Sequence, residues 1–95
     1  MYRVVAPVLL LFLCLTPALA EGPPVAITLR DHQFSPAEVA VPAGVKAELV
    51  IRNEQTTPAE FESTALHREK VIPPGKTVSV FVGPLKPGRY EFFDD

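Results

Sequence analysis

Residues 85–95 of this chain read LKPGRYEFFDD, and this stretch decides the fold class. Pro87 sets φ for the first corner of a type II turn, and Gly88 is expected to supply the positive φ of the second corner. In the aromatic strand that follows, Tyr90 and Phe92 share one face because side chains alternate along a strand. Two adjacent carboxylates come next and point to opposite faces. The stretch therefore predicts a strand with an aromatic inner face and acid groups beside its end.

Strand signals at short spacing fill the preceding sequence. Apolar and polar residues alternate most clearly over 25–30 and 45–52, as expected for half-buried strands. Further strands are predicted at 34–41, 60–63, 71–72 and 77–82, separated by turns rich in proline and glycine. The one segment with helical potential is 63–70. About six or seven short strands with such turns predict an all-β sandwich or barrel.

The N-terminal segment has the three parts of a secretory signal peptide. Arg3 is its one charge, an apolar run follows, and Ala18 and Ala20 provide small residues for cleavage. We predict a signal peptide at 1–20 and one domain at 21–95, exported to the periplasm or secreted. The apolar run is shorter than the roughly 20 residues of a membrane span, so no span is expected after processing. An uncleaved N-terminal anchor is the alternative.

Composition excludes several classes of protein. The chain has 95 residues, nine basic and eleven acidic, with a formal net charge of −2. Without a basic run, nucleic acid is not expected as a partner. Cys14 is the single cysteine and lies in the predicted signal, so the exported domain has no thiolate. No nucleophile motif or phosphate-binding glycine loop is found, and we assign no catalytic residue.

Several more particular motifs extend over 25–95. They are Phe34-Ser35-Pro36, Pro42-Ala43-Gly44, Asn53, the stretch PAEFES at 58–63, Glu69-Lys70, Pro74-Gly75 and the stretch at 85–92. With these motifs the chain resembles the EfeO-type cupredoxin-like domains of bacterial iron uptake systems. The resemblance implies a Greek-key β-sandwich. In that family a His-containing loop and a last strand follow the aromatic strand, so this domain is expected to lack its last strand.

The resemblance also implies a function. Proteins of this type are periplasmic, bind copper or iron, and assist ferrous-iron oxidation or delivery. The implied partners are a membrane iron permease and a periplasmic iron-binding protein.

The resemblance places Glu60 at the position of the first His of a blue-copper site and Asp94 at the position of its Cys. A type 1 copper site needs two His and a Cys thiolate, so blue copper is not expected. The remaining candidate donors are Glu60, Glu62, His67, Asp94, Asp95, His32 and Glu69. Carboxylates with imidazole suit Fe, Mn or Cu(II) better than Cu(I). We predict a copper or iron site made by Glu60, Asp94, His67 and Glu62.

Each assignment has a simpler alternative. Glu60 and Glu62 share a strand face, and both would point into solvent if Phe61 is simply a core residue. His67 would be an exposed side chain without a ligand role, and Asp94 a solvated residue. His32 is expected in a turn, with a capping or solvent role. At the level of function, the alternatives are a metal-free interaction module and a stand-alone ferroxidase.

Overall fold

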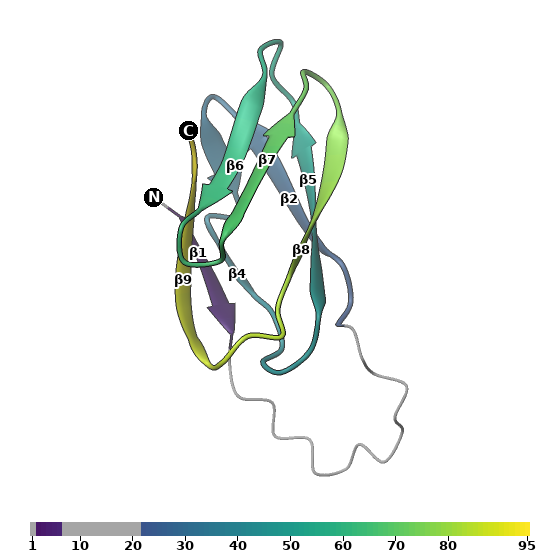
Figure 1. Cartoon of the computed structure of the whole chain (residues 1–95). Helices are drawn as coiled ribbons and strands as arrows, with labels where there is room; N and C mark the ends of the chain where they lie inside the picture. Colours follow the sequence, from purple (N-terminus) through teal and green to yellow (C-terminus); the bar gives the residue numbers. More distant parts are fainter. Residues whose placement is uncertain (1, 7–21) are drawn as a thin grey trace.

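The structure is a computed structural model that describes residues 2–6 and 22–95, and this part of the chain is a sandwich of two β-sheets (Figure 1). Its strands are β1 (Tyr2–Ala6), β2 (Val25–Arg30), β3 (Gln33–Ser35), β4 (Glu38–Ala40), β5 (Ala47–Asn53), β6 (Ala59–Ser63), β7 (Arg68–Ile72), β8 (Thr77–Val82) and β9 (Gly88–Asp94). The predicted all-β sandwich is confirmed. In the described ranges there is no helix, and hence none that could cross a membrane.

The two sheets differ in size. One has five strands in the order β4-β1-β9-β6-β7, and the other has four in the order β3-β2-β5-β8. Parallel pairs join β1 to β4 and β2 to β5, while the other neighbours run antiparallel. Strands distant in the sequence thus become neighbours, and β6 and β9 meet in the middle of the larger sheet.

The core lies between the sheets and follows the predicted alternation. In β2 and β5, Ile27, Leu29, Leu49 and Ile51 are almost fully buried, while the residues between them lie on the outer face. Burial of apolar surface of this kind contributes about 25 cal/mol per Å². The smaller sheet therefore agrees closely with the pattern in the sequence.

Three phenylalanines form the centre of the other half of the core. Phe61 of β6 and Phe92 of β9 stack with ring centroids 5.0 Å apart, and Phe34 of β3 meets both edge to face at 6.1 and 5.2 Å. Such aromatic pairs add about 0.5–1.5 kcal/mol beyond their buried area. Because these rings come from both sheets, they hold the strands β6 and β9 at a fixed distance from β3.

Asn53 is a fully buried polar residue at the end of β5. Its amide nitrogen donates to the carbonyl oxygens of Thr57 and Ile72, both at 2.9 Å, and its amide oxygen accepts from the Gln55 N–H at 2.9 Å. Buried polar groups stabilise a fold when they are hydrogen-bonded in this way. Asn53 therefore ties the loop after β5 to the end of β7.

Two local predictions were wrong. No helix forms at 63–70: β6 ends at Ser63, whose hydroxyl donates to the Glu91 carbonyl at 2.6 Å and accepts the Leu66 N–H at 3.1 Å. Such side-chain bonds to the backbone favour a turn over a helix. Gly88 does not take a positive φ and simply begins β9. The glycine of this connection that has a positive φ is Gly83, directly before Pro84, with φ 91°.

The N-terminal strand was not expected. Tyr2–Ala6 lies within the predicted signal peptide, yet it forms β1 between β4 and β9, and Val4 is fully buried. Residues 7–20 and the predicted cleavage point after Ala20 lie outside the described residues. Export and cleavage therefore stay predictions, while the strand adds to the sandwich a position that the sequence analysis did not assign.

Candidate metal centre

The alternation of β6 determines which of its side chains are available to a ligand. Ala59, Phe61 and Ser63 are buried, and Glu60 and Glu62 are half-buried on the outer face of the sheet. The spacing prediction for this strand is confirmed, because Phe61 is in the core and both glutamates share the opposite face.

The neighbours of β6 add further carboxylates to this face. In the antiparallel pair with β7, Glu62 lies opposite Glu69. On the other side β9 pairs Phe61 with Asp94 and Glu62 with Phe93, and the Asp95 N–H then donates to the Glu60 carbonyl at 3.1 Å. The end of β9 is thus fixed beside Glu60.

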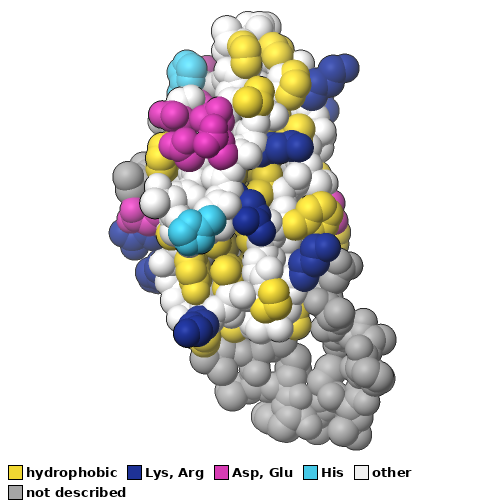
Figure 2. Space-filling model, in the orientation of Figure 1, with side chains coloured by type: hydrophobic (Ala, Val, Ile, Leu, Met, Phe, Trp, Pro, Cys, Tyr) yellow, Lys and Arg dark blue, Asp and Glu magenta, His cyan; other side chains and the backbone are white. Residues whose placement is uncertain are grey.

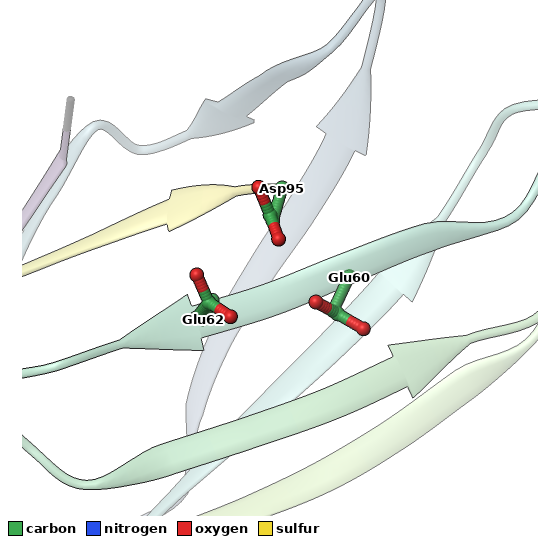
Figure 3. Close-up of side chains that lie close together, drawn as sticks. All are labelled: Glu60, Glu62 and Asp95. Carbon is green, nitrogen blue, oxygen red and sulfur yellow. The ribbon is translucent and has the colours of Figure 1, made fainter.

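Three carboxylates converge at this place. Glu60, Glu62 and Asp95 each offer one oxygen, and these oxygens all lie within 4.8 Å of one another. Figure 3 shows Glu60 and Glu62 rising from β6, with Asp95 facing them from the end of β9. On the molecular surface a compact group of acidic side chains covers this part of β6 (Figure 2). We call Glu60, Glu62 and Asp95 the carboxylate cluster.

The carboxylate cluster is electrostatically unfavourable without a counter-charge. Burial raises the pKa of Glu60 above its usual range, and the negative charges of Glu69, Asp95, Glu62 and Asp94 raise it further, in that order. The pKa of Glu62 is raised first by burial and then by Asp95 and Glu69. Like charges at short distance disfavour ionisation, so a bound proton or cation would stabilise this face.

Asp94 points away from the carboxylate cluster. One carboxylate oxygen accepts the Glu60 N–H at 3.0 Å, and the other lies 3.4 Å from Nδ1 of His32. Its side chain is 11% exposed. Asp94 therefore lies beside Glu60, but it contacts the backbone of Glu60 rather than its carboxylate. Its predicted role as a metal ligand stays a prediction.

His32 reaches Asp94 from the opposite sheet. It lies in a two-residue turn between β2 and β3, in which Asp31 and His32 have φ values of 51° and 61°. Positive φ at both positions is the mark of a type I′ hairpin turn. The His32 N–H donates to the side-chain oxygen of Gln55 at 2.7 Å, which orients the turn. The prediction of a turn is confirmed, and the contact with Asp94 is new.

His67 lies near the carboxylate cluster but not in it. It occupies the turn between β6 and β7 with φ 55°, and it lines an open depression together with Glu62 and Glu69. Its imidazole is not among the donors within 4.8 Å of one another. A role as an additional ligand stays a prediction for this residue.

Asp95 and Glu69 were among the candidate donors but were not assigned to the site. The signal that identifies Asp95 is the alternation along β9. Because Phe92 is buried, Asp94 continues its inward-facing row, whereas Asp95 follows Phe93 on the outer face that Glu60 and Glu62 share. Glu69 is recognised only when the register of β7 on β6 is known.

Comparison with known proteins agrees with the fold. The sequence matches the cupredoxin-like domain family over residues 3–95, so the chain belongs to this family. It is 48% identical over 71 residues to the uncharacterized protein RP394 of Rickettsia prowazekii (strain Madrid E). That alignment covers 75% of this chain and 57% of the relative, so the chain spans little more than half of the relative's length.

Proteins with a cupredoxin fold commonly bind copper, but the residues here do not fit a blue-copper centre. Such a centre needs a Cys thiolate and two imidazoles. The single cysteine, Cys14, lies outside the described residues, and the converging donors are all carboxylates. The carboxylate cluster instead offers hard oxygen ligands to a cation.

Proposed function

We propose that this protein is an exported, periplasmic metal-binding protein of the cupredoxin-like family that binds copper or iron and assists ferrous-iron oxidation or its delivery to a membrane iron permease. The observation that carries the proposal is the convergence of Glu60, Glu62 and Asp95 on one exposed face. A β-sandwich gains no stability from gathering like charges there. A bound cation would neutralise these charges and so account for the arrangement.

The donor set narrows the choice of metal. Carboxylate oxygens prefer hard cations, and the general order of divalent affinities rises from Mn(II) through Fe(II) to Cu(II). Fe(III) and Cu(II) are therefore the cations we expect to bind most tightly. His67, at the edge of the same depression, would add an imidazole for which iron and copper are also suited.

The iron-uptake role rests on the resemblance to EfeO-type domains. In this proposal the cluster holds the metal on an open surface, where a permease or a periplasmic iron-binding protein has direct access to it. An exposed site with few ligands suits transfer of a metal better than its permanent storage.

Calorimetric titration with Cu(II) and Fe(III) tests the site. We expect stoichiometric binding that weakens at least about tenfold in Glu60→Gln and in Asp95→Asn, because even the loss of an outer-shell partner costs that much in metal proteins. Glu48→Gln is the matched control: Glu48 is also half-buried, but it lies on β5 in the other sheet, where it accepts a hydrogen bond from Ser79 at 2.6 Å. Its affinity should equal that of the wild type.

The titration and an Fe(II) oxidation assay together separate the alternatives. Equal binding by wild type and Glu60→Gln would contradict the carboxylate site. Absence of metal binding would favour the interaction module. Repeated oxidation of Fe(II) by the purified protein would favour the ferroxidase over the carrier.

A further inference from the structure

The strand β1 fills a position inside the larger sheet. It lies between β4 and β9, parallel to the first and antiparallel to the second, and forms backbone pairs with both. In this sheet β4 has no strand neighbour except β1. We call the space bounded by Glu38–Ala40 and Gly88–Phe92 the strand slot. Loss of β1 would expose two unpaired strand edges, which favour pairing with another chain.

The strand slot selects its occupant through the inner face. Val4 is fully buried, and it lies opposite Val39 of β4 and Tyr90 of β9. A β-branched apolar residue fits this position because it packs well on a pleated surface. A polar residue here would be buried without a partner.

The outer face adds a charge preference. Arg3 lies opposite both Glu38 and Glu91, and its guanidinium is 3.8 Å from the Glu91 carboxylate. Next to it, Arg89 of β9 donates to the Glu38 carboxylate at 2.9 Å and so crosses over β1 beside Val5. The slot therefore favours a basic residue directly before the buried apolar one.

We propose that the strand slot is an acceptor for one extended segment of another polypeptide, which enters when residues 1–20 are absent. The segment runs parallel to β4, with a β-branched apolar residue at the position of Val4 and a basic residue just before it. Among residues 22–95, every strand except β4 keeps a strand neighbour when β1 is absent, and β4 and β9 are then left with the two open edges of the slot. Addition of a strand to an open sheet edge is an established mode of peptide recognition.

The proposal goes beyond metal binding, and it does not involve the carboxylate cluster. It applies to the form of the protein that the predicted cleavage after Ala20 would produce. In the whole chain, Tyr2–Ala6 is covalently attached and acts at a high effective concentration. The attached strand therefore keeps other segments out until the connection is cut.

The experiment starts from the full chain with a specific protease site inserted after Ala20. The protein is folded, cut, and incubated with an excess of a fluorescent peptide of residues 1–8. We expect the cut protein to take up one peptide, and the uncut protein to take up at least tenfold less. A peptide with Val4→Asp should also bind at least tenfold more weakly, as should a scrambled peptide of the same composition.

Register is tested by a disulfide. A peptide with Val5→Cys should cross-link to cut protein carrying Arg89→Cys, its direct partner, and not to protein carrying Glu91→Cys. Equal uptake of the wild-type and Val4→Asp peptides, or equal cross-linking at both positions, would overturn the proposal. So would cut protein that releases its N-terminal fragment, keeps its thermal unfolding curve and takes up no peptide. Pairing of cut molecules with each other in place of peptide uptake would show that a second copy is the occupant and would equally contradict it.

Discussion

Asn53 and the carboxylate cluster are both polar groups within one small sandwich, but Asn53 is surrounded by hydrogen-bond partners and the cluster by like charges. Asn53 is fully buried, and its amide donates and accepts hydrogen bonds on all sides. Glu60, Glu62 and Asp95 are more exposed and face one another with like charges. Satisfied polar groups stabilise a fold, whereas unneutralised ones cost stability. Asn53 thus stabilises the fold, whereas the carboxylate cluster is a candidate binding site.

The largest expected change in the free energy of unfolding comes from replacing Asn53, the hydrogen-bonded group. Asn53→Ala removes the donor to the part-buried Thr57 carbonyl and to the buried Ile72 carbonyl, as well as the acceptor of the Gln55 N–H. We expect a loss of about 3 kcal/mol in the free energy of unfolding, measured by urea denaturation. Thr56→Ala, at an exposed position of the same loop, is the control and should stay within about 0.5 kcal/mol of wild type. Similar values for the two variants would contradict the architectural role of Asn53.

Cation binding should give the next largest effect. A metal ion present at a hundred times its dissociation constant raises the free energy of unfolding by about 2.7 kcal/mol if it binds only the folded state. We expect this gain with Cu(II) or Fe(III) for the wild type and for Glu48→Gln. At the same metal concentration, most of it should be absent in Glu60→Gln. Stabilisation that is equal in all three proteins would place the cation elsewhere.

A smaller effect should be visible without metal as a dependence on pH. The folded-state pKa values of Glu60 and Glu62 are raised above the usual value of 4.5, so the folded protein binds protons more readily than the unfolded chain. The contribution of these two groups to stability therefore falls as the pH rises from 4.5 through their raised pKa values. Glu60→Gln should reduce this slope and stabilise the metal-free protein at neutral pH. A steeper slope in the variant would contradict the electrostatic account.

The smallest effect is expected at His32. Its side chain is 78% exposed, so its contact with Asp94 belongs to the class of surface pairs worth less than about 1 kcal/mol. His32→Asn preserves the left-handed backbone, because Asn tolerates positive φ. We expect unchanged metal affinity and a change in stability below about 0.5 kcal/mol by thermal unfolding. A loss comparable to that of Asn53→Ala would give this turn a structural role that its exposure does not indicate.

The two regions also differ in how far the sequence predicts them. Strands such as β5 can be recognised in the sequence because one face is buried, so apolar and polar residues alternate with a period of two. The same rule put Phe61 and the two glutamates on opposite faces of the strand, but it left open which face is buried. It gave opposite faces for Asp94 and Asp95, but the choice between them required following the alternation from Phe92. The contact of Asp94 with His32 joins two sheets and depends on packing that no local pattern encodes.

The unexpected strand shows a second limit. An apolar segment after a single basic residue is typical of export signals, and the same residues have the β-branched character of a strand. The partners of Tyr2–Ala6 are β4 and β9, the second of which is more than 80 residues distant in the sequence. Pairing over such a separation depends on the rest of the sandwich, so the N-terminal pattern alone does not distinguish the two uses.

The adjacent residues Asp94 and Asp95 have one further consequence. Asp94 holds the backbone of Glu60, and the N–H of Asp95 is held in turn by the Glu60 carbonyl. The Glu60 and Asp95 residues are therefore fixed on neighbouring strands by one side-chain bond and one main-chain bond, not by a flexible loop. The conformational entropy of arranging these two residues is lost when the protein folds, so the cation of the proposed function would meet a preorganised pair and need little further ordering.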